Sequence, residues 1–191
     1  MLECAWRTEH LDYIDYHDRQ WGRPVLDGPE LFAKLCLDGQ QAGLSWLTIL
    51  RRTQAYHDAF HGFEPEKVAA MTESDVERLL NNSGIIRHRG KIESIIRNAR
   101  AYLDIDDFST YLWGFMDGRV QVNQWSGSEQ VPTANSQARA MARDLKKRGF
   151  SFVGETICYA FMQAVGMVND HLAHCPCHRC CVDEAKAKGL L

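Results

Sequence analysis

The chain has 191 residues, of which 45% are hydrophobic and 25% are charged, and its formal net charge is -3. This composition is typical of a soluble globular protein and excludes a disordered or fibrous one, and the length suits a single domain. A net charge of -3 predicts no overall attraction to nucleic acid, so any such binding must come from a local basic surface.

No run approaches the roughly 20 apolar residues of a membrane span, and the first residues lack the basic start and apolar stretch of a signal peptide. We therefore expect a cytoplasmic protein. That compartment keeps thiols reduced, so the seven cysteines are not expected to form a disulfide framework. Most of them lie near the two chain ends, which points to metal binding.

Two consecutive helices are predicted around the segment CLDGQQAGLSW, residues 36–46. The first opens at Pro29 and its pattern ends near Gly39. Its apolar face carries Leu31, Phe32, Leu35 and Cys36. The second is capped by Ser45 and continues at helical spacing toward residue 61. Its apolar positions are Trp46, Ile49, Leu50, Thr53, Tyr56 and Phe60.

Helices also dominate the middle of the chain. Thr72 followed by Asp75 resembles a capping box for the next helix. After residues 83–90, isoleucines and small apolar residues repeat every three or four positions to Leu103, which predicts an amphipathic helix. Ser109 precedes another helix, and Asp117 with Gly118 marks a turn.

The last third of the chain holds two more predicted helices. Residues 119–125 alternate weakly, so any strand there is short. Ser136 begins a helix that continues through Leu145 and stops at Gly149, and residues 155–168 are apolar enough for a buried central helix. With strands nearly absent, the predicted class is all-α.

The segment NNSGIIRHRGKI, residues 81–92, predicts a helical hairpin with a basic tip. Gly84 lets the loop bring backbone N–H groups close to an anion, and the following helix N-terminus favours negative charge. Arg87, Arg89 and Lys91 would add contacts to phosphate that do not depend on base sequence. The alternative is an ordinary hairpin whose charges face water.

Two thiols and two imidazoles near the chain ends, Cys4, His17, His171 and Cys175, form a donor set that suits tetrahedral Zn²⁺. Such a site would join the first and last segments and, with four protein ligands, would be structural rather than catalytic. The rival is a local site built from CPCHRCC, residues 175–181, because CxC and CxxC spacings chelate well by themselves.

Five long segments together resemble the bacterial 3-methyladenine DNA glycosylase I (Tag) family of the helix-hairpin-helix DNA glycosylase superfamily. They are YIDYHDRQWGRPVLD, LFAKLCLDGQQAGLSWLTILRR, GIIRHRGKI, LKKRGFSFVGETICYAFMQA and VNDHLAHC. The resemblance implies one glycosylase domain over 1–191 with two helical lobes. One lobe is formed by both termini with the zinc site, and the central lobe contains the hairpin around residues 81–100.

The same resemblance implies a monomeric enzyme that hydrolyses the N-glycosidic bond of 3-methyladenine in alkylated double-stranded DNA, after flipping the base into a pocket. No lysine is indicated as a Schiff-base nucleophile, so we predict a monofunctional glycosylase. The alternative is a non-catalytic protein that binds alkylated DNA, and a third possibility is a zinc-stabilised helical interaction module. The family zinc site maps onto Cys4, His17, His171 and Cys175, with one structural ion per chain.

The resemblance also assigns the pocket. It places Asp38 at the base-recognition position, where the family usually has glutamate, with Tyr16 and Trp46 stacking around the base and Trp6 and Tyr13 completing the wall. The alternative for Asp38 is a helix-end residue that faces solvent. Leu44 is a candidate wedge for the gap left by the flipped nucleotide, and its alternative is a core leucine.

Overall fold

The computed structural model describes residue 4 and residues 8–191. Its helices are α1 (Leu11–Arg19), α2 (Gly28–Gln40), α3 (Trp46–Leu50), α4 (Thr53–Ala59), α5 (Pro65–Ala69), α6 (Glu73–Leu80), α7 (Arg89–Leu103), α8 (Phe108–Trp113), α9 (Ser136–Lys147), α10 (Glu155–Ala164) and α11 (Pro176–Ala187). The short 3₁₀ turns are η1 (His61–Phe63), η2 (Gly114–Met116) and η3 (Ser128–Gln130). Two short strands, β1 (Gln121–Val122) and β2 (Val168–Asn169), pair in parallel. The all-α prediction is confirmed.

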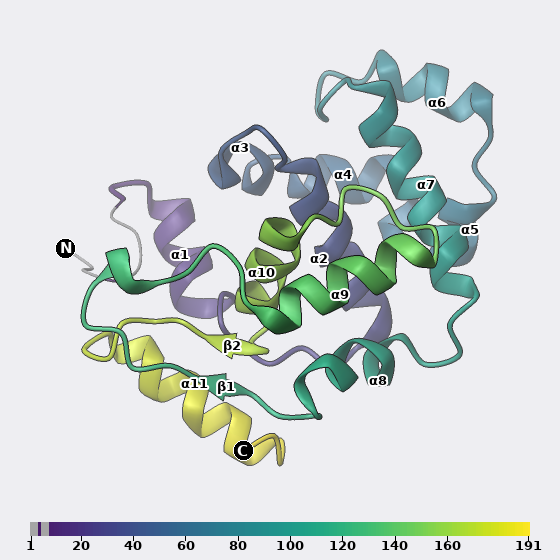
Figure 1. The fold of residues 1–191 in the computed structure, drawn as a ribbon. Coiled ribbons are helices and arrows are strands. Elements are labelled where there is room, and N and C mark those ends of the chain that lie inside the picture. The colour runs from purple at the N-terminus through teal and green to yellow at the C-terminus, as the bar shows by residue number, and fades with distance from the viewer. Residues whose placement is uncertain (1–3, 5–7) are drawn as a thin grey trace.

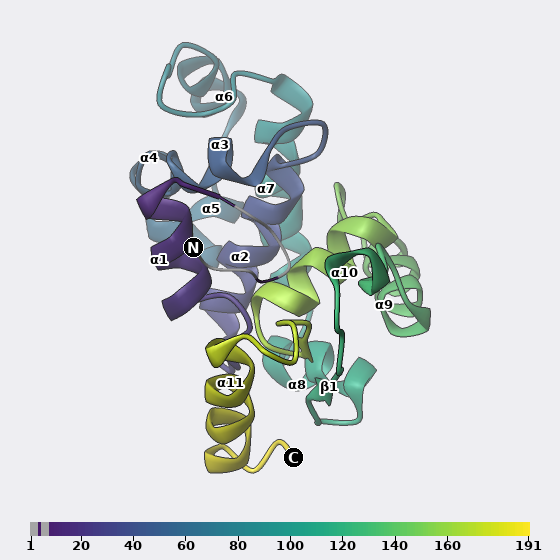
Figure 2. The ribbon, with the colours of Figure 1, turned by 90° about the vertical axis from the view of Figure 1, so that its left-hand side faces the viewer.

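Helix α2 lies at the centre of the molecule. It packs against α7, α8 and α10, and the main hydrophobic cluster draws residues from all of these elements. Figure 1 shows α5, α6 and α7 on one side of it, whereas α11 and the strand pair lie at the opposite end. Figure 2 shows the same separation from another direction. Helix α2 therefore lies between the hairpin region and the end that carries α11 (Figures 1 and 2).

The caps that the sequence predicts are present. Pro29 lies in the first turn of α2, where Asp27 accepts a hydrogen bond from the Glu30 amide. Ser45 caps α3, and Thr72 forms a capping box with Asp75 at the start of α6. Each cap gives a hydrogen-bond partner to a backbone amide that the helix itself leaves unpaired.

The prediction of one helix from Ser45 toward residue 61 is wrong in one respect, because the structure divides this segment into α3 and α4. The break lies at Arg51 and Arg52, where the sequence has no glycine or proline that would indicate it. The Arg52 side chain donates to the Thr48 carbonyl and the Thr53 hydroxyl to the Ile49 carbonyl. Side chains thus supply donors to carbonyls at the break, which stabilises it.

One further detail differs from the sequence prediction, because helix α8 is capped by Asp107 rather than begun after Ser109. Helix α9 begins at Ser136, as predicted, with Asn135 as its N-cap. The cysteine-rich tail forms α11, a helix that the sequence analysis did not predict. Among the described residues, no helix is both long enough and apolar enough to cross a membrane.

Candidate active site and metal centre

Asp38 lies in the last turn of α2, and its side chain is only 3% exposed. The alternative that this carboxylate faces solvent is therefore excluded. Its Oδ1 atom lies 2.5 Å from the Lys34 ammonium, one helical turn earlier on α2. Burial raises the pKa of Asp38, and the neighbouring Lys34 charge partly offsets the rise. A cation beside a buried carboxylate favours its charged form.

Aromatic rings line the same place. The centroid of the Trp46 ring lies 5.4 Å from that of Tyr16, and Tyr13 follows at 6.3 Å from Tyr16. The Lys34 ammonium that contacts Asp38 lies 3.9 Å from the centroid of the Trp46 ring and 5.9 Å from that of Tyr16, so both rings lie near the carboxylate. Burial raises the pKa of Tyr16 well above its ordinary value, and the Asp38 charge adds to the rise. Helices α1, α2 and α3 thus bring Tyr13, Tyr16, Asp38 and Trp46 together. Trp6, the remaining expected wall residue, lies outside the described residues.

Two buried polar atoms at this place have no hydrogen-bond partner in the part of the chain that the structure describes. They are Oδ2 of Asp38 and the indole Nε1 of Trp46. One is an acceptor and the other is a donor. Buried polar groups are normally paired, and an exception marks a place where a ligand or water supplies the missing partner. The pair of atoms is therefore consistent with a binding site for a polar ring.

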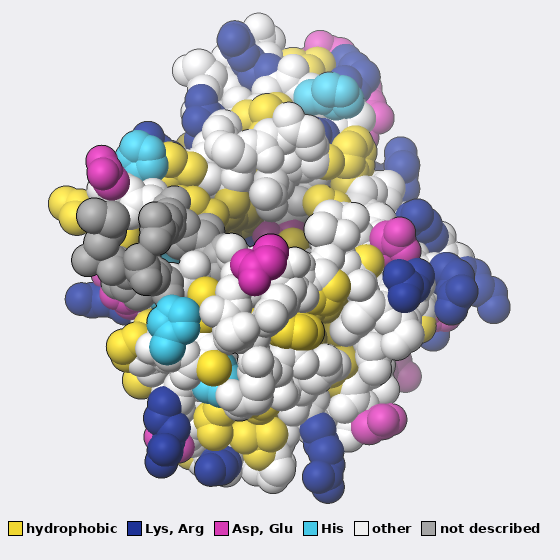
Figure 3. Space-filling model, turned by 60° about the vertical axis from the view of Figure 1, so that its left-hand side comes forward, with side chains coloured by type: hydrophobic (Ala, Val, Ile, Leu, Met, Phe, Trp, Pro, Cys, Tyr) yellow, Lys and Arg dark blue, Asp and Glu magenta, His cyan; other side chains and the backbone are white. Residues whose placement is uncertain are grey.

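A groove of about 560 Å³ borders the Lys34 side chain on the surface between α1, α2, α4 and α10. Tyr16 and Lys34 contribute to its wall, together with Glu30, His57 and Val165. In the space-filling view, one face of the molecule is hollowed near its centre, and hydrophobic and acidic side-chain atoms are visible inside (Figure 3). Of the aromatic and acidic site, Tyr16 lines this groove, whereas Asp38 and Trp46 do not.

The loop between α2 and α3 exposes Leu44, at 40% of its surface, beside Gly43 in a left-handed conformation. Leu44 is not a core leucine, so the structure removes that alternative. Leu44 stands two positions before Trp46 of the aromatic site in the chain.

The hairpin between α6 and α7 distributes its basic residues differently. Arg87 is exposed, and we find no ion pair between it and any residue that the structure describes. Arg89 instead forms ion pairs with Glu73 and Glu77 of α6, so part of its charge already links the two helices. A Cβ atom added at Gly84 would lie 2.9 Å from the Ala55 Cβ atom, so glycine is required by the close approach of the hairpin to α4.

Lys91 corrects an expectation from the sequence. It is only 6% exposed, and its ammonium donates to the Gln40 and Ala42 carbonyls, each at 2.7 Å. Its charge therefore stabilises the C-terminal end of α2, where helical carbonyls lack partners and a cation is favourable. The structure gives this lysine an internal role, so we do not place it on a DNA-contacting surface.

Gln40 extends this link between the hairpin and the end of α2. Its amide donates to the Lys91 carbonyl, and its oxygen accepts from the Tyr56 hydroxyl, which in turn accepts from the Ile86 amide. Gln40 is only 1% exposed. The sequence alone indicates no defined role for this glutamine. It joins the hairpin to the helix turn that carries Asp38.

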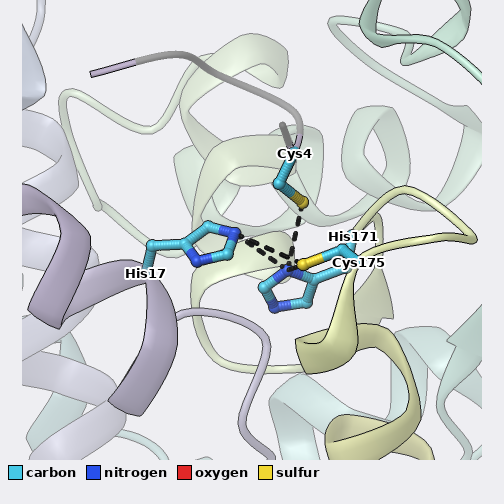
Figure 4. Close-up of side chains that lie close together, drawn as sticks. All are labelled: Cys4, His17, His171 and Cys175. Atoms are coloured by element: carbon cyan, nitrogen blue, oxygen red, sulfur yellow. Dashed lines mark hydrogen bonds between the residues drawn. The ribbon is translucent and has the colours of Figure 1, made fainter. Parts of the chain in front are cut away.

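The metal-ligand set predicted from the sequence is assembled. Cys4, His17, His171 and Cys175 are all buried, and one ligand atom of each lies within 4.8 Å of the others. Figure 4 shows the four side chains pointing toward one another from the N-terminal segment, α1 and the loop before α11. Cys175 forms the N-cap position of α11, so it lies at a helix end rather than within the helix.

The distances between donor atoms fit a tetrahedral ion. His17 Nε2 and His171 Nδ1 are 3.1 Å apart, and the thiols of Cys4 and Cys175 lie 3.4 and 3.7 Å from His171 Nδ1. Ordinary zinc bond lengths in a tetrahedron require about 3.4 Å between nitrogens and about 3.6 Å between nitrogen and sulfur. The residues present therefore fit a metal ion.

The groups around this cluster fix the orientation of both rings. His17 Nδ1 lies 2.7 Å from the Asp18 carboxylate, and His171 Nε2 lies 3.1 Å from the Trp21 carbonyl. Each ring donates through that nitrogen and keeps the other as a ligand. Hydrogen bonds from Cys4 first, and then from His17 and His171, lower the pKa of Cys175 well below its ordinary value. Gly22 is required here, because a Cβ atom would lie 2.9 Å from His171 Nε2 and its φ is +80°.

Residues 175–181, CPCHRCC, do not form a local metal site of their own. His178 Nε2 lies 2.8 Å from the Asn123 carbonyl, and Cys180 is exposed. Cys177, Asp18 and His17 form a second group with ligand atoms close together. This group shares His17 with the first one. Of the two metal arrangements considered from the sequence, the structure assembles the one that joins the chain ends.

Asp170 is a buried residue that the sequence analysis did not assign. The Asn123 amide and the Trp125 indole donate to one of its oxygens, whereas the Tyr159 hydroxyl and the Gln163 amide donate to the other. It follows β2 directly and precedes His171. A carboxylate with four donors is a fixed structural element, and it holds the segment that carries His171.

Comparison with known proteins gives consistent matches over nearly the whole chain. A model of the methyladenine glycosylase family matches residues 6–178. The chain is 51% identical to DNA-3-methyladenine glycosylase 1 of Escherichia coli K12, over 93% of this chain and 97% of that protein. It is 49% identical to DNA-3-methyladenine glycosylase of Haemophilus influenzae, over 91% of this chain and 96% of that protein.

Solved structures agree with these matches. A tyrosine-to-phenylalanine variant, at position 16, of 3-methyladenine DNA glycosylase I in complex with 3-methyladenine has a TM-score of 0.91 and 41% identity, over 93% of this chain and 98% of that one. A glutamate-to-glutamine variant, at position 38, of the Staphylococcus aureus protein matches with the same values. The substituted positions in these two variants, 16 and 38, have the same numbers as Tyr16 and Asp38 in this chain.

Proposed function

This chain belongs to the methyladenine glycosylase family, and from this premise we propose that it releases 3-methyladenine from alkylated DNA by hydrolysing the N-glycosidic bond. The observation that carries the proposal is the buried Asp38 carboxylate beside the rings of Tyr16 and Trp46. Such a site suits a flat, positively charged base. The products are the free base and an abasic site in the DNA.

Charge distinguishes the damaged base from the normal one. Adenine methylated at N3 carries a positive charge while it is attached to the sugar, whereas adenine is neutral. A desolvated carboxylate attracts the cation strongly and gains nothing from the neutral ring, because the electrostatic attraction grows as water is excluded. The rings of Trp46 and Tyr16 add a stacking surface that accepts either base. Asp38 therefore distinguishes the methylated base from normal adenine.

Bond cleavage needs little help from a general acid. The electron pair of the sugar–nitrogen bond passes to the base and neutralises its charge, so the base leaves as a neutral molecule. A water oxygen bonds to the sugar carbon and releases a proton to solvent. The protein must extract the nucleotide from the helix and hold the base while the sugar remains open to water. Asp38 contacts a charge that disappears during this step, so it favours binding of the lesion more than the chemical step itself.

We assign the DNA-facing surface to the α2–α3 loop and the hairpin. Exposed Leu44 serves as the wedge, and Arg87 contacts phosphate. Arg89 contributes less, because it is paired with Glu73 and Glu77. Gly84 sets the approach of the hairpin to α4 rather than binding phosphate through its amide, which donates to Asn82.

The metal is zinc in this proposal, with Cys4, His17, His171 and Cys175 as its four ligands. A bound ion would stabilise the fold by tying the N-terminal segment to the loop before α11, and four protein ligands leave no position at which to activate water. We further propose one domain over 1–191 that acts as a monomer on double-stranded DNA in the cytoplasm, where its seven cysteines stay reduced.

The direct test is to incubate methylated duplex DNA with the protein and to measure the free base by chromatography. The proposal predicts released 3-methyladenine and abasic sites without strand cleavage. The competing function is binding of alkylated DNA without hydrolysis of the N-glycosidic bond. Tight binding to methylated duplex with no released base would establish that alternative and reject the glycosylase.

A further inference from the structure

The ammonium group of Lys34 already lies in the proposed base site. Its Nζ atom is 2.5 Å from Asp38 Oδ1 and 3.9 Å from the centroid of the Trp46 ring. The Tyr16 ring centroid lies 5.9 Å away. The Lys34 side chain is 17% exposed. One cation thus contacts both the carboxylate and the aromatic face that define the site.

These are the contacts that a cationic base would make in the same place. A positive charge near a carboxylate and over an indole face is stabilised by both, and only one cation can occupy that position at a time. We infer that Lys34 and the alkylated base alternate as the counter-ion of Asp38, so that Lys34 leaves the site when the base enters and returns when it departs. This inference rests on the proposed glycosylase function.

The exchange follows from the charge of the base in each state. Before cleavage the base is a cation and can replace Lys34 beside Asp38 without leaving the buried carboxylate unpaired. When the sugar–nitrogen bond breaks, its electron pair passes to the base, which becomes neutral, and the water that attacks the sugar loses its proton to solvent. Asp38 then lacks a counter-ion. The return of Lys34 restores the ion pair and displaces the neutral product.

The structure offers a place for Lys34 when it leaves. The side chain also borders the groove of about 560 Å³ between α1, α2, α4 and α10. Glu30 lies one turn before Lys34 on α2 and lines the same groove. A glutamate four residues before a lysine is the favourable order for a helical ion pair. Rotation of the Lys34 side chain therefore exchanges one carboxylate partner, Asp38, for another, Glu30.

The test is Lys34→Met, which keeps the apolar stem and removes the charge. If Lys34 occupies the site for nine tenths of the time, its removal strengthens binding of free 3-methyladenine about tenfold. The concentration of free base that halves activity on methylated duplex should fall by the same factor. Single-turnover cleavage should be retained, whereas steady-state turnover should slow, because the neutral product leaves more slowly.

Matched variants separate these effects from loss of the fold. Lys67→Met alters an exposed lysine paired with Glu64 and should leave both inhibition and turnover unchanged. Lys34→Arg retains a cation and should keep inhibition near that of the natural chain. In an Asp38→Asn background, Lys34→Met should no longer change binding of the base, because the carboxylate that couples the two is gone. Circular dichroism establishes that each variant is folded, and Lys34→Gln replaces Lys34→Met if the latter is not.

The inference and the proposed function fail in different ways. Absence of base release by the natural chain would reject the glycosylase. Normal release by the natural chain, with equal product inhibition in folded Lys34→Met or Lys34→Gln, would overturn the role of Lys34 alone.

Discussion

At the scale of single residues, the base site is defined by a carboxylate whose only ion-pair partner among the described residues lies on the same helix. The aspartate at 38 and the rings at 16 and 46 were predicted from sequence resemblance, and the structure brings them together. Lys34 was not predicted, although its spacing of four residues from Asp38 was visible. Spacing alone could not show that this pair faces the interior, because the same interval on an exposed face is common.

Trp46 is expected to supply the stacking surface. Trp46→Ala should weaken binding of free 3-methyladenine by about 1–3 kcal/mol, the usual value for a base stacked on an aromatic ring. Calorimetric titration with the free base measures this directly. Trp125→Ala is not a suitable control because Trp125 donates to Asp170. Leu11→Ala serves as the control, because Leu11 is 81% exposed and its loss should leave binding of the base unchanged. Equal losses of affinity in Trp46→Ala and Leu11→Ala would contradict the assignment.

At the scale of elements, most helices and their caps were predictable, since the caps rely on local hydrogen bonds. The break between α3 and α4 was not, because it depends on side chains that bond to backbone carbonyls without any glycine or proline. Helix α11 was missed because its cysteines were interpreted as ligands. Lys91 was assigned to a basic surface from charge alone, whereas tertiary packing places it against the end of α2.

Lys91→Met tests the coupling of the hairpin to α2. Two carbonyls would lose their donor, which should lower the free energy of unfolding by about 1–3 kcal/mol. Because those carbonyls belong to Gln40 and Ala42, the turn that positions Asp38 should loosen and base release should slow. Urea unfolding and release assays measure the two effects. Arg87→Met is the control: it should weaken DNA binding in a salt-dependent way and leave the unfolding free energy unchanged.

At the scale of the whole molecule, the Cys/His cluster that could hold a metal joins segments more than 150 residues apart, as the His17 to His171 separation of 154 shows. We expect about one zinc per chain. Cys4→Ser should lower the zinc content and, for a loss of about 3 kcal/mol, should lower the melting temperature by about 6–12 °C. Elemental analysis and calorimetry measure these quantities. Cys180→Ser alters an exposed thiol and should change neither, and full zinc in Cys4→Ser would contradict the site.

Several exposed carboxylates also govern stability against acid. The Thr72 amide lowers the pKa of Asp75, the Thr110 hydroxyl lowers the pKa of Asp107, and Arg148 lowers the pKa of Asp144. Their contributions are present above the ordinary value of 3.8 and are lost as pH falls through the lowered folded values. The free energy of unfolding should therefore fall as pH drops below 3.8 and through the lowered folded pKa values. A flat stability profile over this range would contradict these contacts.

The claim on which the whole account depends is that the Asp38 charge selects the alkylated base. The most direct measurement is the Kd for methylated duplex, taken from the concentration dependence of single-turnover release, for Asp38→Asn, with Asp183→Asn, an exposed aspartate on α11, as control. Loss of a charged hydrogen bond of about 1.5–3 kcal/mol predicts a Kd about 10- to 100-fold higher for Asp38→Asn and no change for the control. Equal values for Asp38→Asn and the natural chain would contradict the account.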